Sequence, residues 1–165
     1  MKILLITTLF PHSTGGIGDY SYRLARHLSN GDDELHVLTS EDSHIIKTCN
    51  FCNIHAVIRS WSVAEYRSVL NIVGQVRPDI VHIQHDTTPY KNKKLLLNVL
   101  PLLIRIFYRK IRIVTTIHEF REHRLRWKLR ALPMMIASDK CVFVDKWDME
   151  TARRQFGFIP SDKLT

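Results

Sequence analysis

The stretch MKILLITTLFPHSTGGIGDYSYRLARHL, residues 1–28, decides the fold of this chain. Residues 3–8 form a short apolar run rich in β-favouring residues, which predicts a strand buried on both faces. Pro11 interrupts the chain before the glycine-rich segment at residues 15–18. A helical pattern follows, and Gly31 lies just past it, where a left-handed helix cap is expected. The apolar positions of this helix recur at helical spacing: Ile17, Tyr20, Leu24, Ala25 and Leu28.

A strand, a glycine-rich loop and a helix in this order often bind a phosphate. Free N–H groups and the helix dipole favour negative charge at a helix start, and glycines let a ligand approach the backbone. The alternative is that Gly15 and Gly16 only form a tight turn. The dinucleotide fingerprint G-x-G-x-x-G fits less well, because residues 16–21 (GIGDYS) end in serine and the loop is several residues too long. Dinucleotide binding therefore ranks second.

Strand and helix patterns alternate through the rest of the chain. Strands are expected at residues 34–40, 55–58, 80–85, 111–117 and 139–144, and helices at residues 62–76, 95–108, 121–135 and 146–156. Ser62 and Glu65 have the spacing of a capping box, Pro101 is expected to kink or restart its helix, and Gly157 is expected to close the last helix. This alternation predicts an α/β, Rossmann-like three-layer domain with a parallel, doubly wound sheet.

Polar residues cluster where three predicted strands end, at residues 13–16, 85–86 and 118–119. Ligands of such sheets bind at the carboxyl ends of the strands, near the switch point. In the doubly wound order 3-2-1-4-5-6, strands one, four and five are neighbours. The three clusters are therefore expected to line one crevice.

Composition limits the classes of protein and partner. The 165 residues suit one domain with a core, and the formal net charge of +8 favours anionic partners. No signal peptide is evident, and no apolar run reaches the roughly 18 residues of a membrane span. Three cysteines favour a reducing, cytoplasmic location over a disulfide framework. Cys49 and Cys52, flanked by His44 and His55, could bind zinc, but one C-x-x-C is a weak signal, and two free thiols in an exposed loop are the favoured interpretation.

Several segments together resemble glycosyltransferases of the GT-B fold and GT4 type. These are GGIGDYSYRLA at residues 15–25, PDIVHIQH at 78–85, IVTTIHEF at 113–120 and Ala137-Ser138-Asp139. The resemblance implies that residues 1–165 form the N-terminal, acceptor-binding half of a GT-B enzyme. Family members continue past Lys163-Leu164 into a nucleotide-sugar-binding domain, which this chain lacks. The isolated chain is therefore expected to be inactive, and the full-length protein to transfer a sugar with retention.

The resemblance also implies roles for individual residues. His118 is expected to be catalytic, by contacting the acceptor or the transferred sugar, although it could only cap a strand end. The donor diphosphate is expected at Gly15, Gly16 and Ile17. Acceptor binding is expected at Thr14, Asp19, His85, Glu119 and Arg121. Asp19 could instead only stabilise the helix start, and Glu119 could only pair with Arg121. No metal or other cofactor is expected; the partners are a nucleotide-sugar donor and a glycan or lipid-linked acceptor, without nucleic acid.

A basic segment near the end of the chain has two interpretations. It contains Arg124, Arg126, Trp127, Lys128 and Arg130. It could be a solvated basic helix, or a helix on an anionic membrane surface, which would make the protein peripheral on the inner face of the membrane. Two other classes of protein stay open: a fragment of an NAD(P)-dependent oxidoreductase, with Glu41 as the acid for the ribose, and a non-catalytic basic module that binds lipid or nucleic acid.

Overall fold

The computed structural model describes residues 1–11, 16–29, 31–41, 49–85, 95–121 and 125–165; the side chains of Arg126 and Trp127 are not among the described parts. Within these residues the chain forms a six-stranded parallel sheet in the order β3-β2-β1-β4-β5-β6. The predicted doubly wound topology is therefore confirmed. The strands are β1 (Lys2–Ile6), β2 (Glu34–Ser40), β3 (Asn53–Ile58), β4 (Ile80–His85), β5 (Arg112–Ile117) and β6 (Lys140–Phe143).

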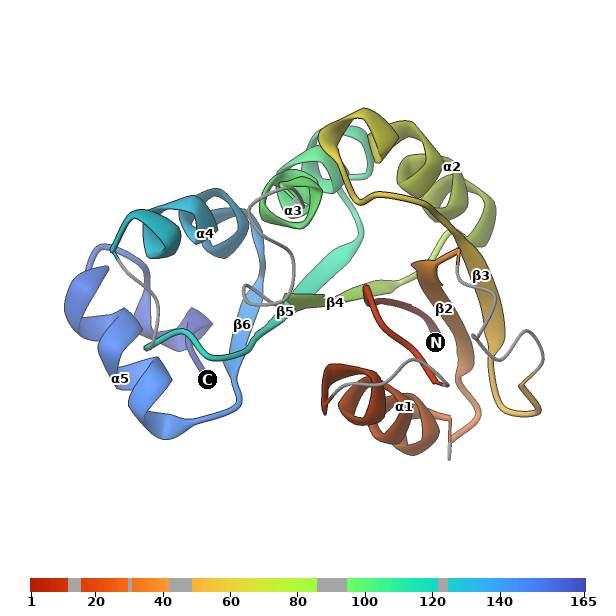
Figure 1. The fold of residues 1–165 in the computed structure, drawn as a ribbon, viewed down its shortest axis with the longest axis horizontal. Helices are drawn as coiled ribbons and strands as arrows, with labels where there is room; N and C mark the ends of the chain where they lie inside the picture. Colours follow the sequence, from red (N-terminus) through yellow and green to blue (C-terminus); the bar gives the residue numbers. More distant parts are fainter. Residues whose placement is uncertain (12–15, 30, 42–48, 86–94, 122–124) are drawn as a thin grey trace.

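Helices cover both faces of the sheet (Figure 1). Leu4 and Ile6 of β1 pack into the core beneath α2 and α3, whereas Ile3 and Leu5 pack on the α1 side. The first strand is therefore buried on both faces, as its sequence predicts. The α-helices are α1 (Gly16–Leu28), α2 (Tyr66–Val76), α3 (Leu96–Phe107), α4 (Leu125–Ala137) and α5 (Lys146–Gln155).

Helix α1 approaches the sheet through small side chains. Its buried residues are Gly18, Ser21 and Ala25, and the hydroxyls of Ser21 and Thr7 hydrogen-bond at 2.9 Å. Ile17 and Tyr20, predicted on the buried face, are half-buried. Gly31 does not have the positive φ expected of a left-handed cap; the helix ends with the Ser29 N–H donating to the Ala25 carbonyl.

The predicted capping box at Ser62 is wrong. The Ser62 side chain makes no cap hydrogen bond, and residues Val63–Glu65 form a 3-10 turn before α2 begins at Tyr66. The Glu65 carboxylate instead accepts hydrogen bonds from the Arg59 and Ser60 backbone N–H groups. Val63, predicted in the buried stripe, is therefore turned to solvent.

Later helix details also differ from the sequence predictions. Helix α3 runs through Pro101 without restarting. Helix α5 ends at Gln155, with Phe156 in the cap position and φ of −127°. Gly157, predicted to close that helix, has no positive φ.

The two cysteines of the C-x-x-C segment are free thiols and do not lie in an exposed loop. Cys52 is buried with Val37 and Phe10 on the α1 side, and burial raises the pKa of its thiol. His55 pairs in register with Leu38, whose side chain lies in the core beneath α2 and α3. His55 and Cys52 are therefore on opposite faces of the sheet. His44 lies outside the described residues. Among the residues that are described, no three His, Cys, Asp or Glu side chains gather so as to hold a metal ion.

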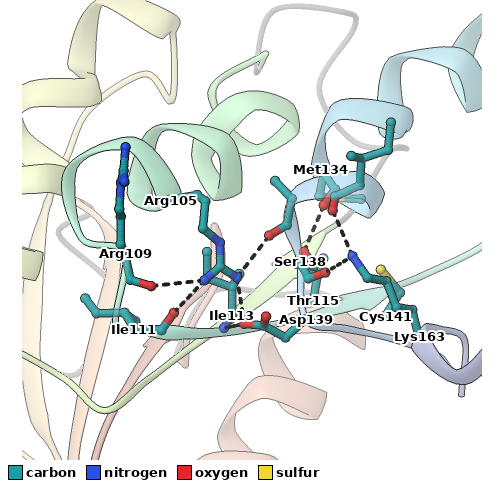
Figure 2. Close-up of polar contacts among 12 residues, drawn as sticks. Arg105, Arg109, Ile111, Ile113, Thr115, Met134, Ser138, Asp139, Cys141 and Lys163 are labelled. Carbon is teal, nitrogen blue, oxygen red and sulfur yellow. Dashed lines mark hydrogen bonds and ion pairs between the residues drawn. The ribbon is translucent and has the colours of Figure 1, made fainter. Parts of the chain in front are cut away.

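Arg105 holds α3 and α4 against the amino ends of β5 and β6 (Figure 2). Its guanidinium donates to the backbone carbonyls of Arg109, Ile111 and Ala137, each at 3.3 Å. It also forms an ion pair with Asp139 at 2.7 Å, and the same carboxylate accepts the Ile113 N–H. This contact lies at the edge of the sheet opposite the predicted crevice.

Candidate active site

The carboxyl ends of β1, β4 and β5 are neighbours, as the predicted crevice requires. Gly16 and Ile17 open α1 just after β1. His85 ends β4, and His118 directly follows β5. The His118 backbone N–H donates to the His85 carbonyl at 3.2 Å. Thr14 and Gly15, which are also predicted site residues, lie outside the described residues.

His118 is held by a buried glutamine of the neighbouring strand. Its side-chain Nε2–H donates to Gln84 Oε1 at 2.9 Å. An amide oxygen only accepts hydrogen bonds, so this contact places a proton on Nε2 of the imidazole. Since His118 is only 8% exposed and Gln84 is fully buried, the ring orientation is fixed from within the sheet.

The same polar contacts continue along β4. Gln84 Nε2 donates to His82 Nε2 at 3.3 Å, and Thr116 Oγ1 lies 2.8 Å from that nitrogen. Burial, together with the charge of His118, lowers the pKa of His82 to about 4. His82 is therefore neutral at pH 7, and its unprotonated Nε2 can accept the hydrogen bond that orients Gln84 and, through it, His118.

Helix α1 meets this group of side chains through Tyr20. The Tyr20 and His118 rings pack edge to face, with their centroids 5.1 Å apart. Tyr20 lies one turn after Gly16, so the start of α1 and His118 belong to one region. The Thr7–Ser21 hydrogen bond fixes α1 against β1 in the same region.

The His85 ring does not share a face with that of His118. His85 is buried, and Asn98 Nδ2 of α3 donates to its Nε2 at 3.1 Å. Because successive strand residues point to opposite faces, His82 and Gln84 face α1, whereas His85 faces the α3 side. An acceptor role for His85 stays a prediction, and the structure gives it a packing role at the base of α3.

The loop after β5 makes a tight turn that is fixed by α5. Glu119 has a left-handed backbone with φ of 54°, which is uncommon for a residue other than glycine. The buried Asp148 carboxylate accepts the next two backbone N–H groups, from Phe120 at 3.0 Å and Arg121 at 2.7 Å. The side chains of Glu119 and Arg121 are exposed, and Asp19 is exposed in the first turn of α1.

Lys128 is buried, contrary to the prediction that it contacts a membrane surface. It is only 5% exposed, and its ammonium lies 5.4 Å from the centre of the Phe120 ring. Burial lowers the pKa of this lysine, an effect that Asp148 opposes. The cause is the orientation of α4, whose 128, 131 and 135 positions face the core. Arg130 is exposed, Arg124 lies outside the described residues, and only the backbone of Arg126 and Trp127 is described.

The sequence patterns do not predict three residues of this region: Gln84, Tyr20 and Asp148. A signal for Gln84 exists, because a polar residue inside an apolar strand needs a hydrogen-bond partner when it is buried. The pattern around Tyr20 indicates only an apolar helix position. Asp148 resembles an ordinary acidic residue of a first helical turn, and nothing local links it to the loop after β5.

The sequence matches the family model described as Glycosyltransferase Family 4 over residues 14–165. The chain therefore belongs to this family of glycosyltransferases, and the resemblance seen in its motifs is confirmed. A search of curated protein sequences found no match.

Solved structures with a similar fold include other glycosyltransferases. An alpha-glucosyltransferase in complex with UDP and a 13-mer DNA containing a HMU base has a TM-score of 0.62 and 17% identity, covering 94% of this chain and 40% of its own. An alpha-glucosyltransferase in complex with UDP has a TM-score of 0.61 and 15% identity, covering 94% and 39%. The chain thus spans about two fifths of the length of these proteins.

A similar Rossmann-like sheet also occurs in a dehydratase. A dTDP-glucose 4,6-dehydratase from Bacillus anthracis in complex with NAD has a TM-score of 0.55 and 10% identity, covering 87% of this chain and 53% of its own. At these identities the likenesses establish the fold alone. The family match distinguishes this chain from the dehydratase class.

Proposed function

We propose that this chain is the acceptor-binding half of a GT-B enzyme that transfers a sugar from a nucleotide-sugar to an acceptor with retention. The family match over residues 14–165 carries the proposal. A second, nucleotide-sugar-binding domain would follow this one and close over the crevice. Sugar transfer then needs both halves, because the donor and the acceptor would be held by different domains.

In this proposal, the start of α1 and His118 act on the two sides of the reacting bond. The N–H groups at Gly15, Gly16 and Ile17 would stabilise the leaving diphosphate, since a helix start favours negative charge. The His118 ring, oriented by Gln84, would exchange a hydrogen bond with a hydroxyl of the sugar or acceptor. The leaving diphosphate would take the acceptor proton, so His118 need not be the base.

The proposed acceptor is a glycan, a lipid-linked molecule or a small molecule, held near Thr14, Asp19, Glu119 and Arg121. We expect catalysis without a metal ion, in the cytoplasm, with peripheral attachment to the inner face of the membrane. The DNA in complexes of related fold makes nucleic acid an acceptor that the test must include. An NAD(P)-dependent reaction has less support, since Glu41, its expected ribose ligand, forms an ion pair with Arg59 at 2.7 Å.

Nucleotide-sugar turnover by this chain and by the longer protein tests the proposal. Each is assayed with UDP-, GDP- and ADP-sugars against glycan, lipid-linked, small-molecule and DNA acceptors. We expect transfer, with retention at the anomeric carbon, only from the longer protein. Turnover by the 165-residue chain alone on the order of 1 s⁻¹ would contradict the two-domain proposal, and an inverted product would contradict retention.

A further inference from the structure

Helix α3 presents an apolar side to solvent. Its twelve residues contain one charged side chain, Arg105, and that guanidinium points to Asp139 at the edge of the sheet (Figure 2). Leu102 is exposed, Ile106 is 58% exposed and Phe107 is 60% exposed. A helix that is apolar on all sides is normally buried, so the outer side of α3 is unusual for a surface helix.

Helix α4 has the same arrangement. Leu125, Leu129 and Ile136 are exposed, and their spacing of four and seven residues puts them on one side of the helix. Lys128, in contrast, is buried under this helix. The apolar stripe of α4 therefore points outward.

The two apolar stripes belong to one surface. Ile113 and Ile117 of β5 point to the same side of the sheet, and they pack in the cores under α3 and α4 respectively. The helices run parallel, since Asn98 donates to the Arg130 carbonyl and Arg105 to the Ala137 carbonyl. We call the side chains of Leu102, Ile106, Leu125, Leu129 and Ile136 the α3–α4 face; Phe107 follows Leu103 by one turn and lies on the side of α3 away from α4.

The positive charge of the chain is concentrated in the same part of the sequence. Residues 91–130 contain twelve Lys or Arg and two Glu, although two of these cations are not available at the surface, since Arg105 pairs with Asp139 and Lys128 is buried. Among the described residues, Arg109 and Lys110 follow the end of α3 directly and are exposed, and Arg130 is exposed on α4. Cations thus accompany the apolar α3–α4 face.

We propose that the α3–α4 face binds the surface of an anionic lipid bilayer. Exposed leucine and isoleucine side chains would enter the boundary between headgroups and acyl chains, and the cations would pair with anionic headgroups. Among the described residues no helix is long and apolar enough to cross a membrane, so the helices would lie on it. This proposal rests on the membrane attachment proposed above and assigns the surface that makes it. The contact is made by the outward apolar side chains of α3 and α4 and not by Lys128.

Vesicle co-sedimentation of the 165-residue chain tests the proposal without any sugar donor. The probes are vesicles of phosphatidylcholine alone and vesicles in which about one lipid in three is phosphatidylglycerol. The second composition gives a clearly negative surface. We expect binding to the anionic vesicles that weakens with salt, and at least about tenfold weaker partitioning to phosphatidylcholine alone.

Two matched pairs of variants locate the contact. The Leu102→Ser/Ile106→Ser chain should partition about tenfold less or weaker still, whereas Val57→Ser/Val63→Ser, at exposed sites on β3 and before α2, should bind like the parent. Arg109→Glu/Lys110→Glu should weaken binding mainly at low salt, whereas Arg154→Glu on α5 should not. Thermal melting checks that each variant is folded.

Three results would overturn the proposal: no binding of the parent chain to anionic vesicles, equal binding by the Leu102→Ser/Ile106→Ser chain, or a dimer of the parent chain that this double variant dissociates. The last result would assign the face to a second copy of the chain. Because no sugar transfer is measured, a lack of vesicle binding leaves the glycosyltransferase proposal intact. A lack of sugar transfer likewise leaves the membrane-surface proposal intact.

Discussion

His118 is a single residue that contacts both parts of the proposed site, strand β4 and helix α1. Its Nε2–H reaches Gln84 on β4, and its ring meets Tyr20 on α1. The same contacts give the residue a structural role, so its replacement must be tested for stability as well as activity.

We expect His118→Ala to lower kcat/KM of the longer protein by about 10²-fold, because a contact that tightens in the transition state is lost. Stability should fall by about 1–3 kcal/mol, since Gln84 Oε1 loses its donor. Steady-state kinetics and urea unfolding measure the two effects. His27→Ala, at an exposed histidine of α1, is the control. Normal kinetics in a destabilised His118→Ala protein would make the residue structural.

The low pKa of His82 predicts how stability depends on pH. Burial lowers this pKa from 6.5 to about 4 in the folded protein, so between these values the unfolded chain binds a proton that the folded chain does not. Stability should be full above pH 6.5 and fall as the pH drops toward 4, by on the order of 3 kcal/mol. Below pH 4 the contribution of His82 should not change further.

The variant His82→Gln should flatten this pH dependence while keeping a polar partner for Thr116. Part of the slope should survive, because the pKa of His55 is also lowered by burial and by His36. Urea unfolding of both proteins between pH 4 and pH 7.5 measures the slopes. Equal slopes would show that His82 does not titrate as its burial requires.

Helix α2 packs closely against the segment after α3 at Gly74. A Cβ at Gly74 would lie 2.7 Å from the Tyr108 hydroxyl oxygen, and that hydroxyl donates to the Leu70 carbonyl at 3.1 Å. Glycine inside a helix costs roughly 1 kcal/mol relative to alanine. Here close packing against Tyr108 explains why glycine occupies the position.

This contact predicts that the sign of Gly74→Ala depends on residue 108. With Tyr108 present, Gly74→Ala should destabilise the protein by about 1 kcal/mol, because the hydroxyl must leave Leu70. In the Tyr108→Phe background the nearest remaining ring atom is 3.7 Å away, and Gly74→Ala should stabilise by up to about 1 kcal/mol. A double-mutant cycle by chemical unfolding measures the difference, and additive effects would contradict the packing explanation.

The strands show what local patterns can and cannot predict. The apolar runs and the alternation with helices predicted each strand to within a few residues, because both depend on neighbouring positions along the chain. The side of the sheet to which each β4 side chain points could not be predicted in this way. Val81 and Ile83 belong to the core beneath α2 and α3, whereas Gln84 faces α1, and only the sheet register shows which partner each polar side chain meets.

Metal dependence is a property of the whole molecule that can be tested directly. Cys52 is buried away from His55, and its raised thiol pKa disfavours the thiolate that zinc binding requires. We therefore expect the melting temperature of the chain, purified without chelator, to be the same with and without EDTA. Stoichiometric zinc together with a large loss of stability in EDTA would contradict this expectation.

The order of the elements, the parallel doubly wound sheet and the family all follow from local sequence patterns. Hydrophobic periodicity, glycine placement and strand-end motifs are local features and can be recognised along the chain. The position of His118 after a buried strand was also predictable.

The hydrogen-bond partners of the polar side chains and the exposed sides of the helices depend on how distant segments pack. Gln84 and His118 are 34 residues apart in the sequence, and Phe120 and Asp148 are 28 apart. The register of β4 against β5 and the docking of α5 bring these pairs together. The rotation of α4 about its axis placed Lys128 inside and Leu129 outside, because helix orientation is set by packing against the sheet and not by the basic composition of the segment.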